Sequence, residues 1–343
     1  MASTTGSLPS GTTYSIIPTK DARVAQELWW SHMLELGWNR SYYDLPSYIS
    51  ATISRGFLLL YLDESDKPQG HVMATVFDNQ TAWIAMFITA PSVRRHGFGR
   101  PLFQAALDDL VTHDVKYCGL DAVTEQVPTY ARRGFVESEK GRVRCMLRPF
   151  GGKVPEVEVP SGWRVRSVEE GDLAGLVRSE RRVIGFERKG LWSRDYLRRP
   201  DAEGFVVLNE SRGRDDALLA WVFVRRSPGG ARLGPVYARD AAAAKLAVTK
   251  GLEIATPEFV KSRPLPGVEM SDLPVDEIRR AATTIVEVSL ANPQALELFE
   301  GFGFANAGVD YHRMWLNGSI PPEQETGGVA EKEMFAIYDA AIG

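Results

Sequence analysis

The sequence predicts an α/β protein of two tandem domains, each a mixed, mostly antiparallel sheet flanked by helices. Three observations support this prediction. Early strands form an antiparallel meander, Trp83–Leu110 reads as strand, turn and helix, and Tyr130–Phe135 shares the spacing aromatic-x-x-x-Gly-Phe with Phe299–Phe304. The chain has 343 residues, enough for two domains that each bury a core.

Composition limits the class of protein. The hydrophobic fraction is 44% and the charged fraction 24%, which are ordinary values for a globular protein. A net charge of −4 argues against nucleic-acid binding, and no apolar stretch is long enough to span a membrane. The first ten residues lack the features of a signal peptide, and Cys118 and Cys145 have no metal-like spacing. We expect a cytosolic protein with reduced thiols, no metal, and no membrane or nucleic-acid partner.

The first strands and helices follow in order from residue 13. Residues 1–12 are small and polar and are predicted to be disordered. Tyr14–Pro18 reads as a strand, and Asp21 is a suitable N-cap for the helix after it. Three apolar segments then make the antiparallel meander, namely Gly56–Leu62, Gly70–Phe77 and Trp83–Ile88.

Aromatic residues are concentrated between Trp29 and Tyr48. Aromatic side chains with polar tips are common in small-molecule sites, so Trp29 and Trp38 are candidates for contact with a substrate. Core packing between two helices is an equally good interpretation of the same cluster.

The stretch after Trp83–Ile88 has the features of an anion site. Pro91 ends the strand, and the glycines at 97 and 99 let the backbone approach a ligand closely. Pro101 opens a helix whose first N–H groups have no intrahelical partner and carry partial positive charge. A pyrophosphate fits such a site, and nearby arginines add full charges. The alternative is an ordinary turn whose arginines face solvent.

The spacing Arg94-x-x-Gly97-x-Gly99 resembles the acyl-CoA pyrophosphate loop of the GNAT superfamily of N-acyltransferases. No Gly-Lys-Ser/Thr follows, as a Walker A loop requires, and Leu102 stands where a Rossmann fingerprint has a third glycine. The resemblance implies that acetyl-CoA is the acyl donor. It implies these binding residues: Phe87, Ile88, Thr89, Arg94, Arg95, His96, Gly97, Phe98, Gly99 and Arg100.

A second stretch resembles a later motif of the same superfamily. Leu120-Asp121-Ala122 is followed by a short helix that carries Tyr130 and ends at Gly134-Phe135. The resemblance implies that Trp83–Ile88 and Tyr117–Val123 splay apart and admit the CoA arm between them. It also implies that Tyr130 protonates the leaving thiolate, while a backbone N–H near residues 87–89 polarises the carbonyl. The alternative makes Tyr130 a packing residue.

The general base is not identified by the sequence. Trp83–Ile88 contains no carboxylate, although many members of the superfamily carry one on or near this strand. Glu125, His71 and His113 stay open as candidates, and so does loss of the amine proton to water.

The second half of the chain repeats the pattern with changes. Residues 13–149 are predicted as the acyl-CoA-binding domain, 150–161 as a Gly/Pro-rich linker and 162–317 as a divergent copy. The copy lacks the Arg-x-x-Gly-x-Gly spacing and has Phe299 in place of Tyr130, so we expect it to have kept the fold and lost CoA binding. Residues 318–343 are predicted as a tail with an amphipathic helix at Glu331–Ile342.

Charged residues after one helix of the second half are candidates for binding the acceptor. Glu180, Phe186 and Arg188 resemble a short pattern in paired GNAT proteins. In that interpretation arginine binds an acceptor carboxylate and Glu180 binds its amine. A solvated surface is the alternative for each of these charges.

These features favour an N-acetyltransferase that transfers acetyl from acetyl-CoA to a small amine, amino acid or related metabolite in a ternary complex. A non-catalytic CoA sensor or scaffold is the main alternative. A protein lysine acetyltransferase is disfavoured because a second domain would cover the acceptor side. We expect a monomer or a homodimer.

Overall fold

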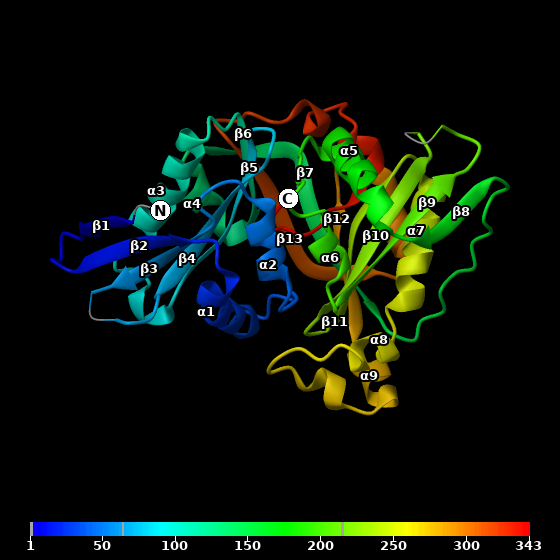
Figure 1. Ribbon diagram of the computed structural model, residues 1–343, viewed down its shortest axis with the longest axis horizontal. Coiled ribbons are helices and arrows are strands. Elements are labelled where there is room, and N and C mark those ends of the chain that lie inside the picture. The colour runs from blue at the N-terminus through cyan, green and yellow to red at the C-terminus, as the bar shows by residue number, and fades with distance from the viewer. Residues whose placement is uncertain (1–2, 64, 214–215) are drawn as a thin grey trace.

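The computed structural model describes residues 3–63, 65–213 and 216–343. In this part of the chain the strands form one continuous sheet of fourteen, in the order β1-β2-β3-β4-β5-β6-β13-β7-β12-β14-β11-β10-β9-β8. Helices flank both halves of the sheet (Figure 1). The predicted fold class, a mixed and mostly antiparallel sheet flanked by helices in two tandem units, is confirmed.

The first half contains seven strands and four α-helices within the described residues. The strands are β1 (Thr4–Ser7), β2 (Thr13–Thr19), β3 (Phe57–Leu62), β4 (Gly70–Val76), β5 (Thr81–Thr89), β6 (Tyr117–Val123) and β7 (Phe135–Pro149). The helices are α1 (Ala22–Glu35), α2 (Asp44–Ala51), α3 (Gly99–Thr112) and α4 (Val127–Ala131). The predicted meander of β3, β4 and β5 is antiparallel, as expected. Residues 4–7 pair with β2, so the prediction that all of residues 1–12 are disordered is wrong.

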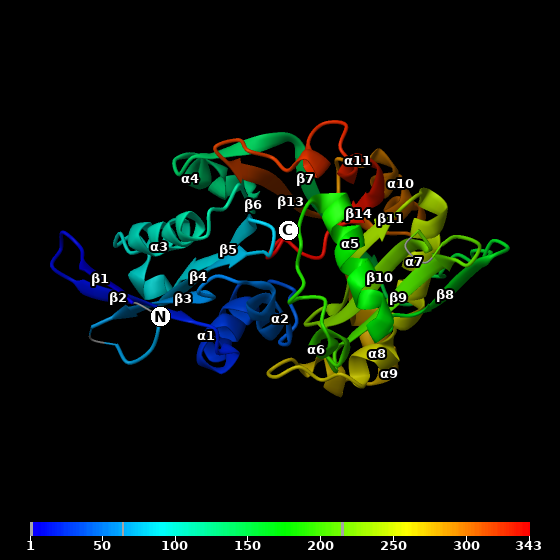
Figure 2. The same cartoon turned by 45° about the horizontal axis from the view of Figure 1, so that its top comes forward.

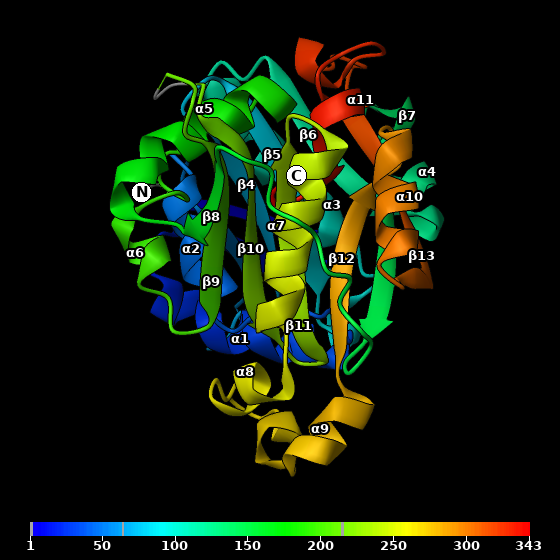
Figure 3. The ribbon, with the colours of Figure 1, turned by 90° about the vertical axis from the view of Figure 1, so that its right-hand side faces the viewer.

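The second half repeats the order of elements from β2 to β7, with α8, α9, α11 and β14 added. Its strands are β8 (Trp163–Ser167), β9 (Ala202–Asn209), β10 (Leu218–Ser227), β11 (Gly230–Ala238), β12 (Thr283–Ser289), β13 (Ala305–Leu316) and β14 (Met334–Ala336). Its helices are α5 (Leu173–Ile184), α6 (Arg194–Leu197), α7 (Ala241–Ile254), α8 (Pro257–Lys261), α9 (Val275–Ala281), α10 (Pro293–Gly301) and α11 (Ala330–Glu333). Helix α7 lies against β9–β11, as the side view shows (Figure 3).

Helices cover the two faces of the first half separately. Neighbouring residues of β4 point to opposite faces. Val72 packs in a core with α3, and Met73 packs in a core with α1 and α2. Figure 2 shows α3 and α4 on one side of β4 and β5, with α1 and α2 on the other.

The two halves are joined by a reciprocal exchange of strands. The C-terminal part of β13 inserts between β6 and β7, where Tyr311–Trp315 pairs antiparallel with β6. The C-terminal part of β7 pairs with β12 through Val143–Pro149. Each half therefore completes the sheet of the other. One sheet continues across the predicted domain boundaries at residues 149 and 162.

The prediction for the tail is wrong. Helix α11 ends at Glu333, and the chain continues as β14 between β11 and β12 instead of a helix to Ile342. The segment after β14 lies between the two halves, where Ile337, Tyr338 and Ile342 are fully buried. Apolar residues on every side of this segment suit burial between two walls better than an amphipathic surface helix does.

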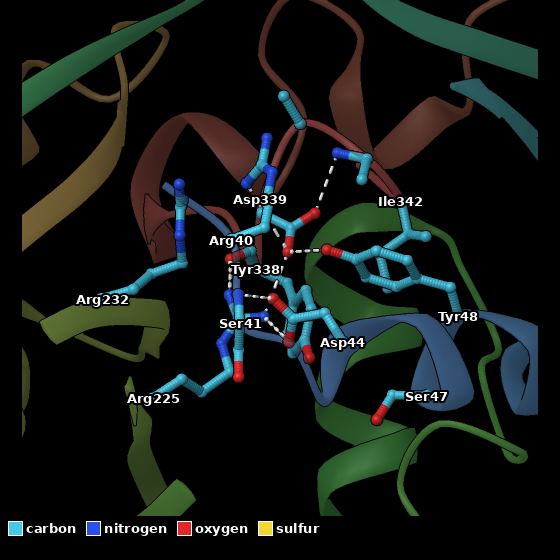
Figure 4. A network of polar contacts seen from close by, with 12 residues as sticks. Arg40, Ser41, Asp44, Ser47, Tyr48, Arg225, Arg232, Tyr338, Asp339 and Ile342 are labelled. Carbon is cyan, nitrogen blue, oxygen red and sulfur yellow. Dashed lines mark hydrogen bonds and ion pairs between the residues drawn. The ribbon is translucent and has the colours of Figure 1, made fainter. Parts of the chain in front are cut away.

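A buried ionic network fixes this segment (Figure 4). The Asp339 carboxylate accepts a hydrogen bond from the Tyr48 hydroxyl at 2.8 Å and lies 3.1 Å from Arg225 Nη1 and 3.7 Å from Arg40 Nη1. Burial alone would raise the pKa of Asp339, but Arg40 and Arg225 lower it below its ordinary value. Arg225 also binds Asp44 of α2 at 2.9 Å, so the network ties the tail to both halves.

We predict that Asp339→Asn destabilises the protein by roughly 3 kcal/mol, because it leaves buried arginine charge uncompensated. Urea unfolding measures the change. The control is Glu253→Gln, which removes an exposed pair with Lys250 at 2.6 Å and should cost less than about 1 kcal/mol. Equal losses in the two variants would show that the buried network contributes no more than a surface pair.

Candidate functional site

The candidate site is a cavity where β5 and β6 separate. The strands pair in parallel only over Thr81–Trp83 and Tyr117–Gly119. Beyond that point they diverge around a cavity of about 450 Å³. It is lined by Leu36, Trp38, Arg40, Ile84, Ala85, Met86, Phe87, Ile88, Thr89, Arg94, Asp121, Ala122, Val123, Gln126, Tyr130, Tyr311, Ala340 and Ala341. The splay was predicted only through the family resemblance, and the structure has it.

The lining residues come from both faces of the sheet. Ala122, Phe87 and Tyr130 belong to the core beneath α3 and α4. Met86 and Ala341 belong to the core that contains α1 and α2. Because both sets line one cavity, it connects the two faces through the gap in the sheet. Two reactants can therefore approach the same point from opposite sides.

A bulge in β5 lies at this gap. Met86 and Phe87 stand opposite the single residue Val72 of β4, and Met86 has φ of 53°. The Nδ1–H of His71 donates to the Met86 carbonyl oxygen at 2.8 Å, because a carbonyl only accepts. His71 Nε2 therefore accepts from His32 Nδ1–H at 2.9 Å. Two buried histidines thus hold the bulged residue in place.

The glycine loop and α3 lie at one side of the cavity. Gly97 has φ of 96°, a conformation that favours glycine, and Arg94 lines the cavity while its Nε donates to the Thr89 carbonyl at 2.9 Å. Helix α3 begins at Gly99 without a side-chain cap at Phe98. The predicted start was Pro101, which instead sits in the first turn, where its missing N–H costs no intrahelical bond. Arg95, His96 and Arg100 are exposed around this helix start.

Tyr130 forms part of the cavity wall. Its ring packs 5.8 Å from Phe103 and 6.4 Å from Phe135, between centroids. Burial raises the pKa of Tyr130 to about 12, so the phenol is protonated at neutral pH and can donate its proton. Both interpretations of this residue are therefore visible, since it packs in the core and also faces the cavity.

The three candidate bases do not line the cavity. His71 is fully buried, and burial, followed by the neighbouring His32, lowers the pKa of His71 to about 3. Glu125 is exposed, and His113 Nδ1 bonds to the Asp109 carbonyl on α3. Asp121 contributes only backbone to the cavity, because its fully buried carboxylate binds Arg313 at 2.9 Å and 3.0 Å. The base therefore stays unassigned.

Of the two tryptophans proposed to contact an acceptor, one lines the cavity. Trp38 does so and is 38% exposed. The prediction for Trp29 is wrong, because it is fully buried against Trp30 and Tyr48 in the core between the helices. The aromatic stretch thus supplies one tryptophan to the cavity wall and another to the core.

The prediction that Glu180, Phe186 and Arg188 contact an acceptor is also wrong. Glu180 and Arg188 are fully buried and paired with each other, and Phe186 packs between Trp83 and Trp315. Arg188 Nη1 donates to the Ile342 carbonyl at 2.7 Å. These residues act on the cavity indirectly, by holding the segment that brings Ala340 and Ala341 to its wall.

Several cavity residues were not predicted from the sequence. Arg40, Tyr311, Ala340 and Ala341 come from the α1–α2 connection, β13 and the tail. The strand exchange and the buried tail bring them together, and no local motif marks either. In the described residues, no group of three or more His, Cys, Asp and Glu gathers as a metal site. No helix there is long and apolar enough to cross a bilayer.

Comparisons with known proteins find similarity to acyltransferases. Residues 43–148 match the family model for an acetyltransferase (GNAT) domain. Holothin acyltransferase of a Pseudoalteromonas species is 27% identical over 54% of this chain, a match that spans 58% of that relative. Mycothiol acetyltransferase of Acidothermus cellulolyticus is 25% identical over 74% of this chain and 78% of its own length.

Solved structures share the fold of the whole chain. A candidate acetyltransferase from Pyrococcus horikoshii superposes with a TM-score of 0.67 at 20% identity and covers 96% of each chain. A tandem GNAT protein from the clavulanic acid biosynthesis pathway has a TM-score of 0.59 at 15% identity, over 88% of this chain and 97% of its own. The predicted tandem arrangement is confirmed at the level of the fold.

We predict that the buried His71 makes stability depend on pH. An unfolded histidine binds a proton below pH 6.5, whereas burial lowers the pKa of His71 to about 3. The unfolded state therefore gains a proton first, and stability falls as pH drops from about 6.5, by up to about 1.4 kcal/mol per pH unit. The free energy of unfolding, measured with urea at pH 7, 6 and 5, should change less with pH in His71→Asn than in wild type. In the exposed His96→Asn it should change with pH as in wild type. The same pH dependence in all three proteins would show that His71 is not the source of the effect.

Proposed function

We propose that this chain, which carries a GNAT acetyltransferase domain at residues 43–148, transfers an acyl group from acyl-CoA to the amine of a small acceptor. The observation that carries the proposal is the cavity, which runs through the sheet and has Tyr130 in its wall. The names of the relatives, an acyltransferase and an acetyltransferase, support acyl transfer. Acetyl is the acyl group that we propose.

In this proposal the donor enters from the α3 face. The uncapped start of α3 and the Gly97 turn take the pyrophosphate, with Arg94, Arg95 and Arg100 nearby. The separated edges of β5 and β6 present backbone groups to the amide-containing arm of CoA. This places the thioester near the β5 bulge at Met86, where a backbone N–H polarises its carbonyl.

The acceptor then enters from the opposite face. Trp38, Arg40, Tyr311 and Ala340 line that side of the cavity. The neutral amine attacks the thioester carbonyl, a C–N bond forms and the C–S bond breaks. Tyr130 gives its proton to the departing thiolate and is reprotonated through solvent by the proton that the amine releases.

A CoA sensor without turnover is the second candidate. It is favoured by one observation, namely that the carboxylate and imidazole groups of the described chain considered as bases all lie outside the cavity or in ion pairs. Release of thiol with any amine separates the two candidates. Cytosolic location and a monomeric or homodimeric state remain predictions.

We predict that Gly97→Val abolishes acetyl-CoA binding, with an affinity loss of at least about 100-fold, because a branched side chain disfavours the positive φ and fills the space of the pyrophosphate. Isothermal titration calorimetry measures the loss. Gly308→Val is the matched control, since Gly308 also has a positive φ, 80°, and open surroundings. Wild-type affinity in Gly97→Val would reject the loop as the CoA site.

We predict that Tyr130→Phe lowers kcat by about 100-fold and leaves acetyl-CoA affinity unchanged, because only the proton donor is lost. The assay is thiol release from acetyl-CoA with the fastest amine from a screen of amines and amino acids. Tyr117→Phe, on β6 and outside the cavity, should keep the wild-type rate. A wild-type rate in Tyr130→Phe would return that residue to packing alone.

A further inference from the structure

The second half of the chain contains a gap equivalent to the candidate site. Strands β11 and β12 pair in parallel over Gly230–Leu233 and Thr283–Val286, then separate as β5 and β6 do. The bulges match as well. Gly234 and Pro235 of β11 stand opposite one residue of β10, as Met86 and Phe87 of β5 stand opposite one residue of β4.

The second gap is occupied by the chain itself. Strand β14 lies between the separated strands, with Ala336 paired to Val236 of β11 and also to Val288 of β12. The next amide, Ile337 N–H, donates to the Glu287 carbonyl at 3.0 Å. Matched from the bulges, Val236 and Tyr237 take the places of Ile88 and Thr89, which line the open cavity of the first half. Strand β14 thus lies where the open cavity lies in the first half.

The helix start beside the second gap is also occupied. In the first half, α3 begins without a side-chain cap. In the second half, the Asp240 carboxylate accepts a hydrogen bond from the Ala243 N–H at the start of α7, at 2.8 Å. A carboxylate at this place satisfies the helix start and repels a phosphate.

Gly234 shows that the backbone of β11 accommodates the tail. It has φ of 152°, and a Cβ there would stand 2.5 Å from the Ile337 carbonyl oxygen. A residue with a side chain would therefore displace the tail or strain the bulge.

We propose that residues 334–337 occupy, in the second half, the position that the acyl-CoA arm takes in the first, so that the chain supplies its own peptide to this slot and binds one acyl-CoA. Asp240 fills the matching pyrophosphate position. The second half thereby serves as an anchor, and the anchored segment extends to Ala340 and Ala341 in the wall of the open cavity. The proposal rests on the proposed function in that the first gap is taken to bind acyl-CoA.

The first test is the stoichiometry of acetyl-CoA binding by calorimetry. We expect one acetyl-CoA per chain in the wild type and none in Gly97→Val, whose altered loop belongs to the first half. Two per chain in the wild type, with one left in Gly97→Val, would show that the second slot is open and would overturn the proposal. One per chain in both proteins would reject the Gly97 loop as the CoA site, and the second measurement would then decide the proposal. No binding by the wild type would reject the proposed function instead, and the second measurement then decides the proposal.

The second test needs no acetyl-CoA. Hydrogen exchange followed by mass spectrometry should show slow exchange at the amides of residues 334–337, and Gly234→Ala should speed it at least tenfold. Gly171→Ala is the control, because Gly171 has open surroundings and should leave the exchange unchanged. Fast exchange in the wild type, or no effect of Gly234→Ala, would overturn the proposal.

Discussion

The exchange of β7 and β13 is the constraint on which the rest of the structure depends. Each strand begins in its own half and ends in the sheet of the other, so the two halves cannot separate without breaking hydrogen bonds along both strands. The exchange brings Tyr311 of β13 into the first half, where it lines the cavity. A site in one half is thus built partly from the other.

The buried tail depends on this joined sheet. Its strand needs the gap between β11 and β12, and its charged residue Asp339 needs partners from both halves. A buried carboxylate is costly unless it is paired and hydrogen-bonded, and Arg225, Arg40 and Tyr48 meet that requirement. The tail then reaches the cavity as a fixed wall.

The two halves show how one architecture supports different roles. Both have a bulged strand beside a gap in the sheet. In the first half the gap leads to a cavity and an uncapped helix, whereas in the second half a strand and the Asp240 cap take those places. A few residues decide whether such a gap is open or occupied. The free hydrogen-bonding groups at a strand edge or helix end can bind either a ligand or another part of the chain.

Local sequence patterns were enough to predict the fold class and the strand, glycine turn and helix within residues 83–110. These patterns can be recognised in the sequence because each spans only a few residues. They are the alternating apolar strands, the glycines at 97 and 99 and the repeated aromatic-x-x-x-Gly-Phe spacing. The binding role of the glycine loop and the catalytic role of Tyr130 stay predictions. Only the tertiary structure decided which of the candidate side chains are buried and what they contact. Glu180 and Arg188 pair with each other and Trp29 enters the core, because whether a particular side chain is buried depends on its surroundings as well as on its type. The apolar tail became a strand for the same reason: its hydrogen-bonding partners lie on β11 and β12, distant in sequence, and the folded sheet alone brings them within reach.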